Sequence, residues 1–327
     1  MYSPDELHGL NAMMPSFAKE GATSLTAVDT VDVGNLTDAV ERIINDGVNV
    51  ISTTGSYGEV STLLWEEMQT LFSATRDVVK QRVPVFYGIT SWNGRDAVRK
   101  ARFVRDIGGE AVFVGVPFYY TPTVDNAIAF YQEFAELFPD LSIQIYHNPT
   151  LHRIHIPVAA FEQLSKIPNI VSMKDSHRSP MEFMALQRHV RGKISVFVNQ
   201  NQYYPYQQWG APGFWSTACW MGPWPLLYLR DLVDAGDYAR AEQVLFDLTG
   251  GRTGGLEEVA GPMDNARRLG ASYAGYSKQG PNRSPYMVVK PESLERQIKI
   301  AERWKGLCDK YRPLVEATAR IPVGAAR

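Results

Sequence analysis

Residues 169–175 read NIVSMKD, an apolar β-strand that ends in a lysine. A buried ammonium group costs desolvation energy unless it reaches water or pairs with a charge. The same burial lowers the pKa of a lysine and can turn its side chain into an amine nucleophile. Lys174 is therefore either catalytic or an ordinary strand-end lysine that reaches water or Asp175. This stretch alone favours the ordinary lysine, so the choice between the two roles of Lys174 depends on the rest of the sequence.

Similar apolar runs recur along the chain and alternate with amphipathic helical stretches. Eight βα units of this size predict an α/β protein, a (β/α)8 TIM barrel, whose site lies at the carboxyl ends of the strands. An open doubly wound sheet is the alternative, but no GxGxxG follows an early strand. The expected strands cover residues 11–17, 48–53, 84–88, 111–116, 142–146, 170–173, 194–198 and 213–216. The expected helices cover residues 36–45, 65–80, 94–107, 124–138, 157–166, 180–190, 203–209 and 225–235.

The pattern becomes purely helical after Gly236. Helices are expected at residues 238–249, 262–269 and 291–311. The predicted organisation is a barrel with the active site (1–236), a C-terminal helical extension (237–312) and a flexible tail (313–327).

Composition narrows the classes of partner. Among the 327 residues, 33 are basic and 35 acidic, so the net charge of −2 gives no reason to expect nucleic acid or an anionic membrane. No apolar run approaches the length of a membrane span, and no signal peptide is expected at the N-terminus. The two cysteines have no metal-ligand spacing, and a disulfide framework is not expected. A reducing compartment and a cytoplasmic location are therefore expected.

Polar residues follow several of the predicted strands. Residues 55–59 read GSYGE, a tight turn whose backbone N–H groups suit a carboxylate, although an ordinary βα turn is the alternative. Tyr146 ends the strand next to that of Lys174, so the two side chains can converge. A phenol beside an amine can relay a proton during imine chemistry, whereas a packed aromatic is the commoner use of a tyrosine.

Three histidines lie in one segment, at positions 147, 152 and 155. Their spacing is irregular, and no carboxylate cluster joins them. We therefore expect loop or surface histidines and no metal site.

Together, these motifs resemble the dihydrodipicolinate synthase and N-acetylneuraminate lyase superfamily, from about Met13 to Asp237. The correspondence involves the GTTGE turn (55–59), the P-[YF]-Y segment (117–119), the tyrosine of Y-N-x-P (Tyr146), the Schiff-base lysine (Lys174) and the G-[VF]-x-S strand (213–216). The resemblance implies a class I pyruvate aldolase on a TIM barrel with a C-terminal helical extension. It also implies a homotetramer and no cofactor beyond a covalent imine on Lys174.

Where the sequence departs from the common pattern of the superfamily, it resembles the hydratase-aldolases of aromatic hydrocarbon catabolism. Leu151 stands where dihydrodipicolinate synthase has an arginine that grips a second carboxylate, and Asn148 directly precedes Pro149. The resemblance implies hydration and retro-aldol cleavage of trans-o-hydroxybenzylidenepyruvate or trans-2'-carboxybenzalpyruvate to an aromatic aldehyde and pyruvate. The ortho substituent stays open.

The resemblance also implies a role for each site residue. Lys174 forms the imine, Tyr146 moves the proton, and Asn148 orients the added water. Ser56 and Tyr119 complete the proton relay, with Tyr119 acting in its own or a neighbouring subunit. The substrate-binding residues fall into a carboxylate turn and an aromatic pocket: Gly55, Ser56 and Tyr57 in the turn, and Phe118, Trp215, Trp220 and Trp224 in the pocket.

Two other functions remain open. A different pyruvate-dependent aldolase or dehydratase would act on 2-keto-3-deoxy sugar acids and would need polar contacts to hydroxyl groups. A non-catalytic barrel would bind a keto acid without turning it over. The presence of both Lys174 and Tyr146 argues against the silent barrel, because binding alone does not require that pair.

Overall fold

The computed structural model describes residues 1–175, 177–250 and 265–319. Contacts divide the chain into two units that interleave in sequence. We call the first, Met1–Ser16 and Asn49–Ser216, the barrel unit. We call the second, residues 17–48 and 217 onward, the helical unit. The predicted domain boundaries at residues 236 and 312 stay a prediction, because grouping by contacts does not show which segments fold independently.

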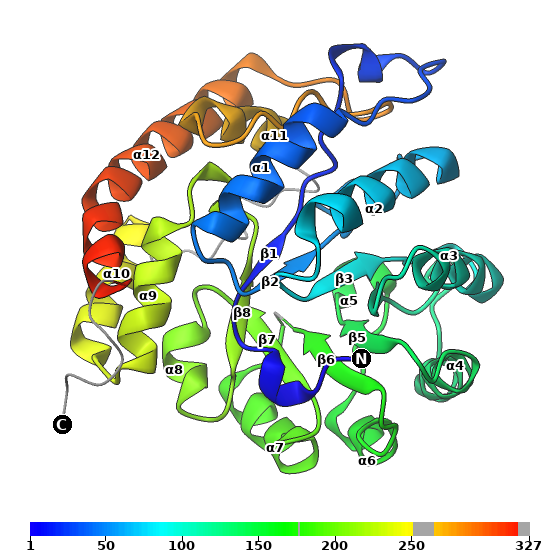
Figure 1. Ribbon diagram of the computed structural model, residues 1–327. Helices are drawn as coiled ribbons and strands as arrows, with labels where there is room; N and C mark the ends of the chain where they lie inside the picture. Colours follow the sequence, from blue (N-terminus) through cyan, green and yellow to red (C-terminus); the bar gives the residue numbers. More distant parts are fainter. Residues whose placement is uncertain (176, 251–264, 320–327) are drawn as a thin grey trace. The chain divides into compact units, whose positions relative to one another are not determined.

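Eight parallel strands form a closed ring in sequence order, which confirms the predicted TIM barrel (Figure 1). The strands are β1 (Gly9–Met13), β2 (Val50–Ser52), β3 (Val85–Gly88), β4 (Ala111–Val114), β5 (Ser142–Tyr146), β6 (Ile170–Lys174), β7 (Ser195–Asn199) and β8 (Gly213–Ser216). The helices of the barrel unit are α2 (Trp65–Val79), α3 (Gly94–Asp106), α4 (Val124–Leu137), α5 (Pro149–His152), α6 (Phe161–Leu164), α7 (Pro180–Val190) and α8 (Tyr203–Gln207).

Strand β1 differs most from its expected range of 11–17. It begins at Gly9 and ends at Met13. Pro15 has no N–H to donate to a ladder, and Phe17 adopts a left-handed backbone with φ 44°. The apolar side chains after Met13 therefore lie outside the strand, so the predicted end was wrong.

The interior of the barrel combines a polar layer with an apolar one. Ser52 Oγ donates to Asn11 Oδ1 at 3.0 Å and lies 3.2 Å from Gln144 Oε1, and Gln144 Nε2 donates to Ser172 Oγ at 2.8 Å. These hydrogen bonds offset the free-energy cost of burying the polar side chains. The apolar layer comes from the strands and from the N-terminal segment, and consists of Leu7, Met13, Val50, Phe86, Ala111, Phe113, Tyr146, Val171 and Phe197.

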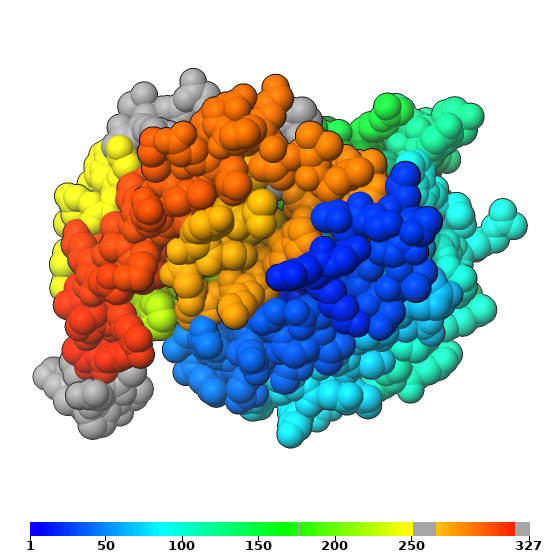
Figure 2. Space-filling view, turned by 90° about the horizontal axis from the view of Figure 1, so that it is seen from above, coloured from blue at the N-terminus to red at the C-terminus, as the bar shows by residue number. Residues whose placement is uncertain are grey.

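The helical unit joins an early segment of the chain to its last third. Its helices are α1 (Val33–Asn45), α9 (Trp224–Asp234), α10 (Tyr238–Thr249), α11 (Asn265–Ala271) and α12 (Pro291–Ala319). In Figure 2 the blue segment that leads into α1 lies beside the orange stretch before α12. In this contact the Ala18 N–H donates to the Gln279 carbonyl. At the other end of α1, the Tyr276 hydroxyl donates to Asp46 Oδ2 at 2.7 Å.

The final helix is longer than expected. Helix α12 continues through Pro313 to Ala319, so the predicted end at Tyr311 was wrong. A proline interrupts a helix by removing one N–H and by crowding the preceding turn, but both effects are local. Residues 320–327 of the predicted tail, and residues 262–264 of the predicted helix 262–269, lie outside the described residues. Within the three described ranges, no helix is both long enough and apolar enough to cross a membrane.

Candidate active site

Strands β5 and β6 bring Tyr146 and Lys174 together as partners in register. Both residues end their strands, so both lie at the carboxyl end of the barrel, as the sequence predicted. Asn169 fixes the start of β6, because its side-chain amide donates to the carbonyls of Ala135, Phe138 and Leu141. A buried asparagine at the opposite end of the strand thus helps to set where the lysine emerges.

The Lys174 amine is held between two aromatic rings. The side chain is only 4% exposed. Its Nζ lies 3.7 Å from the centre of the Trp215 ring and 5.0 Å from that of Tyr146. Burial lowers the pKa of Lys174, while the nearby charges of Tyr146 and Asp175 act in the opposite direction. The net lowering is the direction that an amine nucleophile requires.

Tyr146 has the surroundings of a proton carrier. Its ring stacks on Phe113 with the centroids 4.2 Å apart. Its hydroxyl lies 2.7 Å from Ser56 Oγ and accepts a longer hydrogen bond, 3.4 Å, from Asn148 Nδ2. Burial opposes ionisation of the phenol, but the Lys174 charge and these hydrogen bonds outweigh it, so the pKa of Tyr146 is lowered.

The GSYGE turn lies directly against Tyr146. A Cβ atom on Gly55 would meet Met13 Cε at 3.2 Å and the Phe113 ring at 3.3 Å, so a larger residue would crowd the stack under the phenol. Gly58 admits no Cβ at all, because the Met14 carbonyl would lie 2.8 Å away. Glu59 closes the turn in a left-handed conformation and accepts a hydrogen bond from Ser16 Oγ at 2.6 Å. These contacts hold Ser56 and Tyr57 at the mouth of the barrel.

Asn148 has two roles in the structure. As the residue before α5, its Oδ1 accepts from the Leu151 N–H and caps the helix. Its Nδ2 points the other way, to the Tyr146 hydroxyl. The cap fixes the amide orientation, because an asparagine that accepts at one end has only its NH2 group left to face the phenol.

The predicted aromatic residues fall into different places. Phe118 is half-buried against the His152 ring, with the centroids 5.7 Å apart. Tyr119 is exposed and packs on Trp92 with the centroids 5.6 Å apart. Within the described residues, no hydrogen bond joins the Tyr119 hydroxyl to Ser56 or Tyr146. The relay through Tyr119 therefore stays a prediction.

Trp220 and Trp224 belong to the helical unit. Trp220 is fully buried and packs edge-to-face with Phe17, with the ring centroids 5.8 Å apart. Trp224 packs edge-on against Tyr276 and lies under the Arg312 guanidinium. Their contribution to a substrate pocket stays a prediction.

The expectation of loop or surface histidines holds for His147, in the loop after β5, and for His155, but it was wrong for His152, which lies in α5. His147 and His152 are buried, and only His155 is exposed. His152 Nδ1 lies 3.0 Å from the Tyr146 carbonyl, and burial lowers the pKa of His152 to about 4, with the positive charge of Lys174 adding to the shift. Both buried rings satisfy a nitrogen within the protein, which makes them structural. The spacing of the histidines in the sequence does not predict these hydrogen bonds, because they depend on how residues 147–156 fold back against the barrel.

A buried charge pair next to the lysine escaped the sequence analysis. Asp175 Oδ2 lies 2.8 Å from Arg178 Nε, and both side chains are almost fully buried. Asp175 Oδ1 also lies 2.9 Å from His147 Nδ1. An acid and an arginine three positions apart, directly after a candidate catalytic lysine, were the available signal. No group of three His, Cys, Asp or Glu side chains suited to a metal ion occurs among the described residues.

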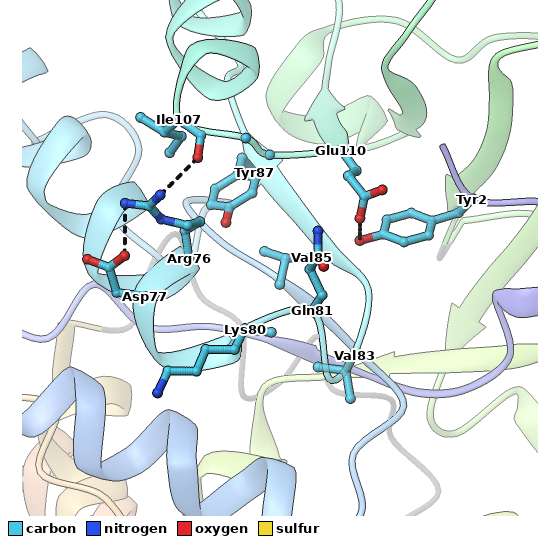
Figure 3. Close-up of a pocket in the computed structure, with 13 residues that line it drawn as sticks. Tyr2, Arg76, Asp77, Lys80, Gln81, Val83, Val85, Tyr87, Ile107 and Glu110 are labelled. Atoms are coloured by element: carbon cyan, nitrogen blue, oxygen red, sulfur yellow. Dashed lines mark hydrogen bonds and ion pairs between the residues drawn. The ribbon is translucent and has the colours of Figure 1, made fainter.

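A separate cavity of about 500 Å³ opens at the amino-terminal ends of β3 and β4 (Figure 3). Its wall includes Tyr2, whose hydroxyl donates to Glu110 Oε2, and Arg76, which pairs with Asp77. None of the predicted site residues lines this cavity. Because the strands are parallel, it lies at the end of the barrel opposite to Lys174.

Comparisons with known proteins place the chain in a family. The model of the dihydrodipicolinate synthetase family matches residues 12–249. The chain is 28% identical to a trans-O-hydroxybenzylidenepyruvate hydratase-aldolase of Pseudomonas aeruginosa, over 94% of this chain and 95% of that protein. It is also 28% identical, with the same coverage of each chain, to a trans-2'-carboxybenzalpyruvate hydratase-aldolase of Nocardioides sp. (strain KP7).

Among solved structures, the chain is similar to one described as "PhdJ bound to substrate intermediate". The TM-score is 0.87 and the sequence identity 27%, over 95% of this chain and 99% of that one. The fold, the strand-end lysine with its tyrosine partner, and the family match over most of the barrel define the class. The chain belongs to the dihydrodipicolinate synthetase family.

Burial of Lys174 predicts a pH-dependent cost to stability. Since the pKa of Lys174 is lower in the folded protein than its ordinary 10.5, the unfolded chain binds more protons between these two values. The free energy of unfolding of the wild type therefore rises with pH across this window. Lys174→Met removes the effect. We expect the variant to be more stable than the wild type at pH 7, and the difference to shrink toward pH 10.

Urea unfolding at a series of pH values measures this difference. Lys166→Met, at an exposed lysine of the barrel unit, is the control and should change stability little at any pH. A constant difference between Lys174→Met and the wild type from pH 7 to pH 10 would contradict the expected desolvation cost.

Proposed function

We propose that this lyase is a hydratase-aldolase that adds water to a substituted trans-benzylidenepyruvate and cleaves the product to an aromatic aldehyde and pyruvate. The observation that supports this function most directly is the desolvated Lys174 amine. It lies 3.7 Å from the centre of an indole ring and beside a tyrosine that is hydrogen-bonded to Ser56 and Asn148. An amine, a proton carrier and an aromatic wall are the three parts that this reaction needs. The similarity to two hydratase-aldolases supports the same reaction.

The first step is formation of an imine. The neutral Lys174 amine attacks the keto carbon, and the carbinolamine loses water to give an iminium ion. The lowered pKa of Lys174 supports this step, because only the unprotonated amine has a lone pair to donate. The substrate carboxylate occupies the turn formed by Gly55, Ser56 and Tyr57, where small residues and a hydroxyl stand close to Tyr146.

Water then adds to the benzylic carbon. The iminium withdraws electrons through the conjugated alkene, so the carbon next to the ring becomes electrophilic. Asn148 Nδ2 orients the water or the new hydroxyl group, since it already points toward the Tyr146 oxygen. Protonation of the neighbouring carbon completes the hydration and restores the iminium.

Cleavage reverses an aldol addition. Tyr146, as the phenolate, takes the proton of the new hydroxyl group, the carbon–carbon bond breaks, and its electron pair moves to the iminium nitrogen. The aromatic aldehyde leaves, and the remaining enamine is protonated and hydrolysed to pyruvate and free Lys174. The lowered pKa of Tyr146 supports its role as the base. In this proposal the lysine is the electron sink, and no further cofactor takes part.

The aromatic group of the substrate fits the apolar side of the site. Trp215 of β8 presents the face of its ring to the Lys174 amine, and Phe118, which follows β4, is half-buried. Flat aromatic walls stabilise an aromatic ligand through buried area and ring stacking. A sugar acid would leave its hydroxyl groups without partners against such walls.

We also propose a homotetramer. Trp92, Tyr119 and Tyr120 form an exposed aromatic patch in which the rings contact one another. A patch of this kind favours contact with another protein surface, and a second copy of the chain would bury it. Such a contact would let Tyr119 act in the neighbouring subunit.

The imine predicts a trappable adduct. Pyruvate followed by borohydride should add a reduced pyruvyl group to the peptide that carries Lys174, because the reagent converts the imine to a stable amine. Peptide mass spectrometry measures the adduct. Lys174→Ala should abolish it, whereas Lys166→Ala should retain it. Active protein without an adduct would refute the imine mechanism.

The phenol of Tyr146 predicts a loss of turnover without a loss of imine formation. Tyr146→Phe should lower kcat by about two to four orders of magnitude, because the proton of the hydroxyl group has no acceptor. The borohydride adduct should persist, since the lysine is intact. Wild-type kcat in this variant would make Tyr146 a packing residue only.

Substrate choice tests the function itself. The kcat/KM values for trans-o-hydroxybenzylidenepyruvate and trans-2'-carboxybenzalpyruvate should be compared with that for a 2-keto-3-deoxy sugar acid. We expect at least one aromatic substrate to exceed the sugar acid by about hundredfold or more, because unpaired polar groups penalise the sugar. A preference for the sugar acid would refute the proposal, and no turnover of any substrate would favour a binding protein.

A further inference from the structure

Asp175 is the centre of a buried network directly behind Lys174. Its carboxylate contacts His147 Nδ1 at 2.9 Å, Arg178 Nε at 2.8 Å and the His177 backbone N–H at 3.2 Å. Its own N–H donates to the Phe197 carbonyl on β7 at 2.9 Å. Neither Asp175 nor Arg178 touches the reacting atoms in the proposed mechanism, so the chemistry does not account for this buried pair.

The hydrogen bonds fix the tautomer of His147. The Ile156 N–H donates to Nε2 of His147 at 3.2 Å, so that nitrogen accepts and carries no proton. Nδ1 is therefore the protonated nitrogen of a neutral ring, and it donates to Asp175. Burial lowers the pKa of His147, in keeping with the neutral form. The negative charge of Asp175 is thus balanced by Arg178 and not by the histidine.

Arg178 ties this charge to the segment after β5. Its Nη2 donates to the Ile156 carbonyl at 2.7 Å, while the Ile156 N–H holds His147. The Arg178 carbonyl accepts from the Tyr206 hydroxyl at 2.8 Å. The carboxylate of Asp175 is thus held by His147 and Arg178, its N–H is held by β7, and Arg178 is held in turn by Ile156 and α8, which together leave the Asp175 backbone little freedom to move.

The backbone carbonyl of Asp175 also binds the Trp215 side chain. The Trp215 indole N–H donates to the Asp175 carbonyl at 3.0 Å, and the face of the same ring lies 3.7 Å from Lys174 Nζ. A rotation of the Asp175 peptide would release the indole and remove the ring from the amine. The position of Trp215 thus depends on a carbonyl that the buried carboxylate network holds in place.

We infer that Asp175 is a positioning residue, which acts through its backbone carbonyl to hold the Trp215 ring against Lys174 in the geometry for imine formation. The inference rests on the proposed imine function of Lys174. It assigns to the Asp175–Arg178–His147 network an effect on chemistry and not only on folding. An aromatic face against the amine excludes water and limits the rotamers of a long side chain, and misplacement of a reacting group by about 1 Å can cost about hundredfold in rate.

A double-mutant cycle separates this route from a general loss of structure. The rate of imine formation with pyruvate, trapped by borohydride, is measured for the wild type, Asp175→Asn, Trp215→Phe and the double variant. Asp175→Asn should slow imine formation by about tenfold to hundredfold in the wild-type background. With Phe at position 215 the indole N–H is absent, so Asp175→Asn should cost less than about threefold further. Equal losses in both backgrounds, or no loss in the single variant, would overturn the inference.

The indole N–H gives a second readout that does not depend on the reaction. Its NMR resonance is assigned by its absence in Trp215→Phe, and its hydrogen exchange is measured in each variant. Exchange should be slow in the wild type and at least about tenfold faster in Asp175→Asn, because the tether to the carbonyl is loosened. Unchanged exchange in Asp175→Asn would overturn the inference, whether or not the wild type forms an adduct. A wild type without an adduct would refute only the proposed function.

Matched variants control for charge and folding. Asp96→Asn removes a carboxylate that pairs with Lys100 on α3, and it should leave both the imine rate and the indole exchange unchanged. If Asp175→Asn does not fold, Arg178→Lys takes its place in the cycle. That variant keeps the charge but loses the fork that joins Asp175 to Ile156. Its effect on imine formation should likewise depend on Trp215, and an effect independent of Trp215 would overturn the inference.

Discussion

The site depends on one desolvated amine. Lys174 lies at the end of an apolar strand with an indole ring on one side and a phenol on the other, and burial lowers its pKa. The protein gives up some stability for this, because a buried lysine favours the unfolded state over a range of pH. Much of the surrounding structure either keeps this amine away from water or holds the Tyr146 phenol beside it.

The parallel barrel provides these neighbours through its register. Tyr146 and Lys174 are opposite one another on β5 and β6, and Trp215 comes from the end of β8. The GSYGE turn after β2 places Ser56 on the phenol, with glycines where no Cβ atom fits comfortably. Because parallel strands all end at the same rim, residues far apart in sequence meet there without any special loop geometry.

A layer of buried polar groups behind the rim holds this arrangement. His152 contacts the Tyr146 carbonyl, Asn148 caps α5 while its amide faces the phenol, and Asp175 binds Arg178 and a neutral His147. Buried polar groups that pair with one another favour this arrangement, because another arrangement would lose these contacts without gaining water. In the same layer, His147 and His152 each place a ring nitrogen against a polar group of the protein.

The sequence by itself determined the eight strands, their order and the meeting of Tyr146 with Lys174. These follow from local apolar periodicity and from the shared rim of a parallel barrel. The tertiary structure alone decided that β1 ends at Met13, that His147 and His152 are buried, and that Asp175 lies between Arg178 and the tryptophan tether. It also placed Trp220 and Trp224 in the packing of the helical unit. The reason is physical: strand and helix periodicity fix which face a residue occupies, whereas hydrogen bonds between loops depend on where distant segments pass one another.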